Sequence, residues 1–259
     1  MSIHKTEAIV INKFDFRETS IIANFYTRDF GKISGLLKGI RKEPKKFAST
    51  LEPFSFNEII FYRKINSSLH LVSQCDIRNN FFGIRRDMLK SGAGGIITEL
   101  LHAVMPQEDI NEEVFKLTLD VLHELEVNPE PDKVSTIFKI KILALSGFKP
   151  HFDSCVSCDA KILGQSKFSV LLGGLLCPQC CGKDLTARPI FRGTVASILH
   201  IERSPFRNAL MLGMNPQIKR ELGFVLTSFL NFHLGKKLKS ESVVDTLKAF
   251  SLVANGGKI

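Results

Sequence analysis

The chain has 259 residues, of which 44% are hydrophobic and 24% are charged, and this balance excludes disorder of the chain as a whole. Its formal net charge of +9 makes a polyanion such as nucleic acid the expected partner. No run approaches the ~18 apolar residues of a membrane span. The opening MSIHKTEAIVINKF also lacks the regions of a signal peptide, so we expect a cytoplasmic protein.

The charge is unevenly distributed along the chain. Residues 1–80 carry 13 Lys or Arg against 8 Asp or Glu, residues 81–186 carry 11 against 14, and residues 187–259 carry 11 against 4. Basic ends around an acidic middle predict separate structural units, with the basic ones facing a polyanion. The simpler alternative is a basic protein that binds no particular polyanion.

Five segments of the first 80 residues predict β-strands. Apolar, β-branched and aromatic residues dominate each segment, and short polar or glycine-bearing stretches separate them. The segments are residues 5–16, 20–27, 31–40, 54–65 and 69–77. Five short strands suit a small closed barrel of the OB type, which commonly binds single strands. Periodicity alone does not distinguish it from an SH3-like barrel.

The periodicity becomes helical from Asn79 onward. Apolar residues recur at spacings of three and four, and Asn111 followed by two glutamates is typical of a helix start. The glycines in SGAGG, residues 91–95, lack the GK[ST] of a phosphate loop and follow no strand, so they indicate helix packing or a kink. The predicted helices include residues 112–127, 132–148, 194–202 and 216–235.

Five of the six cysteines lie within residues 155–181. Four of them form the pattern C-x2-C-x18-C-x2-C, the spacing of a four-cysteine zinc site: Cys155, Cys158, Cys177 and Cys180. Two residues between ligands allow a tight turn to direct both thiolates at one ion. Four thiolates leave no open position for water, so the sequence predicts a structural Zn²⁺ ion.

Other interpretations of the cysteines fit the spacing less well. A thioredoxin-like dithiol needs only one CxxC, and iron–sulfur sites usually place three cysteines close together. Cys181 competes with Cys180 as the fourth ligand, and we favour Cys180 because it preserves the second CxxC. Cys75 lies in a predicted strand and is expected to be a small buried hydrophobic residue.

The strongest binding signal is the basic segment GKISGLLKGIRKEPKK, residues 31–46. Six cations stand here against Glu43 alone, and we expect them to contact DNA phosphates: Lys32, Lys38, Arg41, Lys42, Lys45 and Lys46. Aromatic residues near them are candidates for base stacking: Phe25, Tyr26, Phe47 and Tyr62. The alternative is a solvated charged face with these rings in the barrel core.

No GxSxG, HExxH or other catalytic constellation is present, so we expect no enzyme.

The order of these parts resembles the RecO family of bacterial recombination and repair mediators. The most specific matches are YTRDFGKISGLLKGIRK, the leucine-rich segment running to GFKPHFDSCVSC, and HLGKKLKS, where family members often carry Tyr at the position of His233. The resemblance covers nearly the whole chain.

The resemblance implies a non-enzymatic DNA-binding mediator. Proteins of this family bind single- and double-stranded DNA, anneal complementary strands and engage the C-terminal tail of the single-strand-binding protein. They act with RecR to load RecA during repair, which implies association with the nucleoid. DNA contact carries over to the six cations of residues 31–46, and zinc binding to the four cysteines.

The expected fold class is therefore α+β and multidomain. We expect an OB-fold barrel at 1–80, a helical domain formed by 81–150 and 187–259, and an inserted zinc-ribbon-like element at 151–186. Two other functions remain open on the sequence: a zinc-ribbon adaptor that binds only proteins, and an OB-fold protein that binds RNA.

Overall fold

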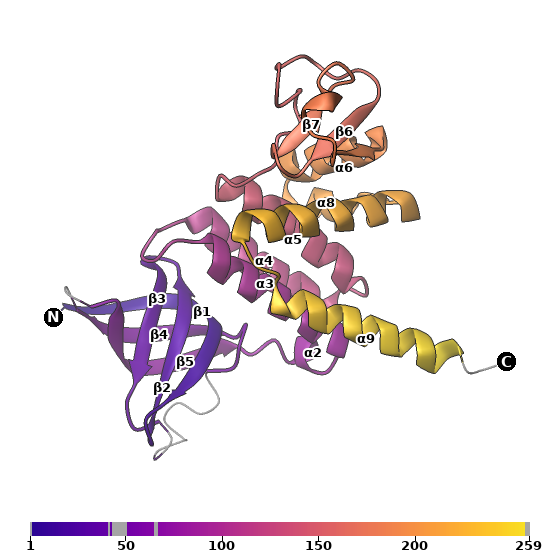
Figure 1. Cartoon of the computed structure of the whole chain (residues 1–259). Helices are drawn as coiled ribbons and strands as arrows, with labels where there is room; N and C mark the ends of the chain where they lie inside the picture. The colour runs from indigo at the N-terminus through magenta and orange to yellow at the C-terminus, as the bar shows by residue number, and fades with distance from the viewer. Residues whose placement is uncertain (1, 41, 43–50, 65–66, 257–259) are drawn as a thin grey trace. The chain divides into compact units, whose positions relative to one another are not determined.

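The computed structural model describes residues 2–40, 42, 51–64 and 67–256. Contacts along the chain define two compact units, which are described separately (Figure 1). The first unit contains the chain up to Ser135 together with the residues from Lys239 onward. The second unit runs from Thr136 to Leu238 and contains the cysteine-rich element.

A five-stranded barrel forms the N-terminal part of the first unit. Its strands are β1 (Ser2–Phe16), β2 (Ser20–Thr27), β3 (Gly31–Leu37), β4 (Phe56–Arg63) and β5 (Leu69–Asn79). They pair in the order β1-β2-β3-β5-β4, and β4 pairs back to β1, which closes the ring. Only the β3–β5 pair is parallel. The five predicted strands and the OB-type barrel are confirmed.

The barrel encloses an apolar core because alternate residues of each strand point inward. Side chains such as Phe25, Ile33 and Phe61 are almost completely buried in it. The predicted burial of Cys75 among these residues is also confirmed. Burying this much apolar surface contributes most of the stability of the barrel.

The helices of the first unit are α2 (Phe82–Arg85), α3 (Met88–Val104), α4 (Glu112–Val127) and α9 (Lys239–Gly256). The predicted cap of α4 is present, since the Asn111 side chain accepts a hydrogen bond from the Val114 N–H at 3.0 Å. A Cβ atom added to Gly92 would lie 2.5 Å from Val244 Cγ2 of α9. The glycines of α3 therefore permit close helix packing, as the sequence predicts.

Helix α5 (Pro131–Leu145) crosses the boundary between the units, and the second unit continues with α6 (Arg192–Arg203), α7 (Phe206–Leu210) and α8 (Pro216–Leu234). A small sheet precedes α6 in the chain. Its strands are β6 (Ser166–Ser169), β7 (Gly174–Leu176) and β8 (Arg188–Ile190), in the order β7-β6-β8. β6 and β7 pair as a short antiparallel hairpin between the two CxxC motifs.

Candidate metal centre and nucleic-acid interface

Two tight turns present the four cysteines of the second unit. In the first turn, the Cys155 N–H donates to the Ala160 carbonyl at 3.0 Å. In the second, Cys177 follows β7 directly, and the Cys180 N–H donates to the Cys177 carbonyl at 3.0 Å. Each CxxC motif therefore brings its two sulfur atoms to the same side of a turn.

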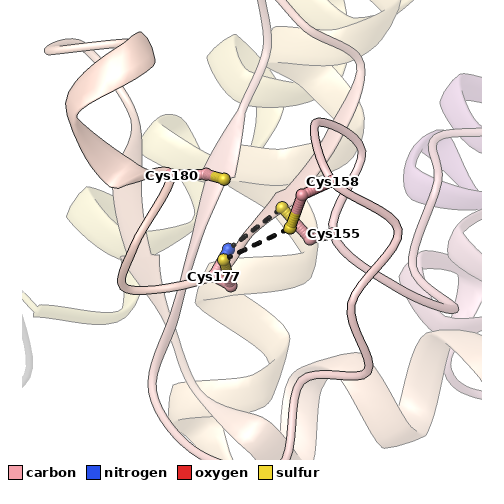
Figure 2. A group of neighbouring side chains, drawn as sticks. All are labelled: Cys155, Cys158, Cys177 and Cys180. Atoms are coloured by element: carbon pink, nitrogen blue, oxygen red, sulfur yellow. Dashed lines mark hydrogen bonds between the residues drawn. The ribbon is translucent and has the colours of Figure 1, made fainter.

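The four sulfur atoms of these residues all lie within 4.8 Å of one another (Figure 2). Four sulfurs about 2.3 Å from one ion, at tetrahedral angles, are separated by about 3.8 Å. The Sγ atoms of Cys158 and Cys177 are 3.8 Å apart, and none of the six cysteines forms a disulfide. The four cysteines thus match a tetrahedral metal site and are too far apart for disulfides.

The electrostatics of the cluster favour a cation. Burial would raise the pKa of the Cys155 thiol, but backbone N–H groups, led by that of Cys177, lower it to about 6. The N–H of Ala160 lowers the pKa of Cys158, but neighbouring sulfur atoms outweigh it and raise the pKa to about 12. One thiolate therefore forms readily and further thiolates repel it. A bound dication would remove this repulsion.

Cys181 lies outside the cluster. Its Sγ donates to the Pro178 carbonyl at 3.0 Å, whereas the Cys180 side chain is buried with the other sulfur atoms. The structure thus groups Cys180 with the other three cysteines and directs the Cys181 thiol elsewhere. Among the described residues, this is the one group of three or more His, Cys, Asp or Glu side chains that is arranged to hold a metal ion.

Buried polar contacts brace the two turns, and sequence reasoning missed them. Ser154 Oγ lies 2.6 Å from His151 Nε2 and also donates to the Asp159 carboxylate, within the first turn. Near the second turn, the Asp184 carboxylate accepts hydrogen bonds from the hydroxyls of Ser169 and Thr186, both at 2.6 Å, and these bonds lower the pKa of Asp184. Side chains outside the four cysteines therefore also hold the two turns in place.

In the first unit, the predicted DNA-contacting cations fall into three groups. Lys38 and Lys42 are exposed and form no ion pair within the part of the chain that the structure describes. Lys32 is buried, and its ammonium group donates to the His102 carbonyl at 2.6 Å. Arg41, Lys45 and Lys46 lie outside the described residues. The Lys32 ammonium group is therefore engaged within the fold, and its contact with DNA stays a prediction.

The aromatic candidates for stacking are mostly enclosed. Phe25 belongs to the barrel core, and Tyr26 is buried against Phe115 of α4. Burial, assisted by Asp109, raises the pKa of Tyr26. Tyr62 is half-buried, and Phe47 lies outside the described residues. Phe14, which sequence reasoning did not select, is 56% exposed on β1.

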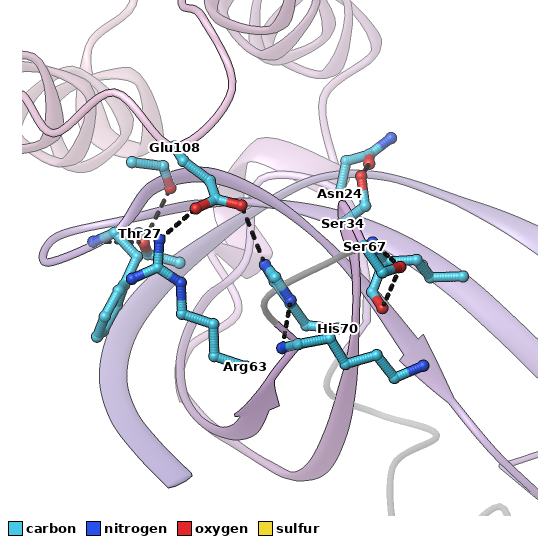
Figure 3. Close-up of polar contacts among 11 residues, drawn as sticks. Asn24, Thr27, Ser34, Arg63, Ser67, His70 and Glu108 are labelled. Atoms are coloured by element: carbon cyan, nitrogen blue, oxygen red, sulfur yellow. Dashed lines mark hydrogen bonds and ion pairs between the residues drawn. The ribbon is translucent and has the colours of Figure 1, made fainter. Parts of the chain in front are cut away.

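The segment between α3 and α4 covers one end of the barrel's outer surface. The Glu108 carboxylate pairs with Arg63 and lies 3.5 Å from His70 (Figure 3). Its backbone N–H donates to the Lys32 carbonyl at 2.9 Å. Burial lowers the pKa of His70, although the Glu108 carboxylate opposes that shift. A Cβ atom at Gly31 would lie 2.1 Å from the Asp109 carbonyl oxygen, so glycine is required for this close approach.

Comparison with known proteins assigns the chain to a family. The family model for the recombination protein O N terminal region matches residues 1–81, and the model for its C terminal region matches residues 85–242. The chain belongs to the RecO family. It is therefore a member of a DNA repair and recombination family, as the resemblance in sequence predicts.

Curated relatives agree along the whole chain. A DNA repair protein RecO from Syntrophus aciditrophicus is 30% identical over 256 residues, which is 96% of this chain and 98% of the relative. Those from Symbiobacterium thermophilum and Desulfatibacillum aliphaticivorans are 26% and 30% identical, covering 96% and 91% of this chain and 99% and 93% of the relatives. Among the described residues, no helix is long and apolar enough to cross a membrane.

Proposed function

We propose that this RecO family protein is a DNA-binding recombination mediator. Its barrel binds single- and double-stranded DNA, anneals complementary single strands and so helps to load the recombinase RecA. The observation that supports this most strongly is an OB-type barrel with exposed Lys38 and Lys42 at the turn after β3. In the sequence, Arg41 lies between these two lysines, and Lys45 and Lys46 follow them. This function requires no catalytic residue.

Cations at this turn act by neutralising phosphates. Each Lys or Arg that contacts a phosphate releases condensed counterions, and this release drives binding at low salt. Two complementary strands repel each other through their phosphates, so a protein that neutralises both lowers the barrier to pairing. Ile40 is buried in the barrel core between exposed Lys38 and Lys42, which anchors the turn to the barrel.

The four-cysteine site is proposed to hold one Zn²⁺ ion. Thiolates of Cys155, Cys158, Cys177 and Cys180 would fill all four positions of a tetrahedral ion, so the ion supplies structural cross-linking and no activated water. The site has the sulfur spacing and the lowered Cys155 pKa that suit such an ion. We expect the ion to hold the cysteine-rich element together.

Membership of the family supports a proposal for the protein partners. The helical part is proposed to receive the C-terminal tail of the single-strand-binding protein and to act with RecR, while RecA is engaged indirectly on the prepared strand. These steps place the protein at the nucleoid during repair. A pull-down of the intact chain with purified RecR, and with the tail peptide, tests each contact separately.

The DNA-binding proposal is tested by changing four cations of the basic segment to alanine: Lys38, Arg41, Lys42 and Lys45. We expect weaker binding to a fluorescent single strand and a shallower dependence of log K on log salt. The slope should fall by about 0.7 for each phosphate that is no longer neutralised, or by about 3 if all four cations bind DNA. An unchanged affinity and slope would contradict this placement of the DNA-binding surface.

A control variant removes the same charge elsewhere. It replaces four exposed cations outside the barrel with alanine: Lys116, Lys161, Arg207 and Arg220. If binding responds only to total charge, the slope will fall equally in both variants.

Competition between DNA and RNA strands of matched sequence distinguishes a DNA mediator from an RNA-binding protein. Absence of salt-dependent binding to either strand would favour a protein adaptor.

A further inference from the structure

The outer face of β1, β2 and β3 carries different kinds of side chain at successive positions along the strands. At one end, Tyr26 of β2 pairs with Lys32 of β3, and both are buried beneath the residues around Glu108 and Phe115. This end of the face is closed within the first unit. Any ligand of the face must therefore bind farther along the strands.

Next along the face is a row of polar side chains. Asn12, Asn24 and Ser34 are cross-strand neighbours on β1, β2 and β3. Asn24 donates to Asn12 Oδ1 at 2.7 Å. Ser34 Oγ donates to Asn24 Oδ1 at 2.6 Å (Figure 3). These bonds fix the three side chains relative to one another and form a rigid border to the closed end.

Beyond the polar row lies an apolar row that the barrel core does not use. Phe14 pairs with Ile22, Ile22 with Leu36, and Leu36 with Leu71 of β5, so the four side chains share the outer face. Phe14 is 56% exposed and the other three are half-buried. With strands about 4.8 Å apart, the row is about 14 Å long.

A β-bulge directs Phe14 outward. Before the bulge, Ala8 and Val10 point into the barrel core, and simple alternation would send Phe14 inward as well. The register shifts between Val10 and Asn12, so that Lys13 aligns with buried Ala23 and Phe14 aligns with Ile22. Bulges often re-aim a side chain at a functional site. The exposure of Phe14 is thus built into the strand.

Cations lie beyond the apolar row, on the side away from the closed end of the face. β1 and β3 both end beside the start of β2, where Arg17 and Lys38 are exposed, and Lys42 follows in the next turn. Asp15 and Glu18 are also exposed here, and the basic segment after Lys42 adds further positive charge in the sequence. Apolar side chains beside cations suit a ligand with flat apolar faces and a polyanionic backbone.

We propose that the row of Phe14, Ile22 and Leu36 binds the unpaired bases of single-stranded DNA, with Phe14 stacking on a base. This inference rests on the proposed DNA-binding function and adds a base-contacting surface to its phosphate-contacting cations. Bases in a duplex are paired and stacked on one another, so their faces are not available to Phe14. The apolar row therefore selects single strands, whereas the lysines bind either form of DNA.

The test compares three ligands of the intact chain: a thymidine oligonucleotide, an abasic oligonucleotide of the same length, and a duplex. The Phe14→Ala change should weaken binding to the thymidine strand by about 5- to 150-fold, the range for removal of one stacked base. Binding to the abasic strand and to the duplex should stay unchanged. The salt slope should also stay unchanged, because every phosphate-binding cation is retained.

Two further variants control the result. Phe14→Tyr keeps a ring and should retain wild-type affinity, and Phe82→Ala removes an equally exposed phenylalanine (50%) outside the barrel and should have no effect. Equal binding of thymidine and abasic strands by the wild type would overturn the base-contacting role, as would an equal weakening on all three ligands in Phe14→Ala. Absence of any salt-dependent DNA binding by the wild type would instead reject the proposed function itself.

Discussion

The barrel and the cysteine-rich element are stabilised in different ways. The barrel encloses a continuous apolar core in which side chains such as Phe25 and Phe61 are fully buried. In the cysteine-rich element, three of the five residues of the buried cluster are cysteines of the candidate metal site, accompanied by Leu176 and Ala187. The barrel is thus stabilised by apolar burial, whereas we expect the element to depend on the ion proposed for its sulfur atoms.

The largest effect in this comparison is expected from removing one sulfur ligand. Cys158→Ser should abolish metal binding and unfold the cysteine-rich element, because metal affinity contributes directly to folding in such small sites. Metal content per chain and hydrogen exchange across residues 155–184 measure both effects. The barrel should keep its exchange protection and its DNA affinity.

Cys181→Ser is the matched control for that variant. Its thiol lies outside the cluster and contacts the Pro178 carbonyl, so the metal content should remain that of the wild type. Loss of metal in Cys181→Ser, with retention in a Cys180→Ser variant, would reverse the assignment of the fourth ligand.

The reciprocal change is made in the barrel core. Phe61 is completely buried, and Phe61→Ala should lower the free energy of unfolding of the barrel by about 3–5 kcal/mol. Denaturation monitored in the barrel should shift to lower denaturant, while metal content stays constant. A simultaneous loss of metal would show that the two regions are not independently stabilised.

A smaller effect is expected at the buried lysine. Lys32→Met keeps most of the apolar stem and removes the hydrogen bond to the His102 carbonyl. We expect a decrease of about 1–3 kcal/mol in unfolding free energy and an unchanged salt slope for DNA binding. A shallower slope with unchanged stability would return Lys32 to the DNA-contacting residues.

Much of this architecture is predictable from local sequence. Alternation identifies the five strands, the Asn111 cap marks the start of α4, and the C-x2-C spacing brings the right sulfur atoms together. These features depend on residues close in sequence, where strand and helix periodicity and turn geometry apply directly.

Two features of the barrel surface are not predictable in that way. The burial of Lys32 depends on a segment about 75 residues away, and a lysine on a strand has the same local pattern whether or not its face is covered. The exposure of Phe14 depends on a bulge after Val10, which reverses the inside–outside alternation of the rest of β1. Both features depend on which part of a strand's outer face is covered and which is open to solvent.

The most direct test of the central claim is the binding of a fluorescent single-stranded DNA to the intact chain across a salt series, with metal content determined on the same sample. We predict an affinity that falls steeply as salt increases, together with one zinc ion per chain. An affinity that is absent or independent of salt, in a sample that contains its zinc, would contradict the assignment of DNA binding to the barrel.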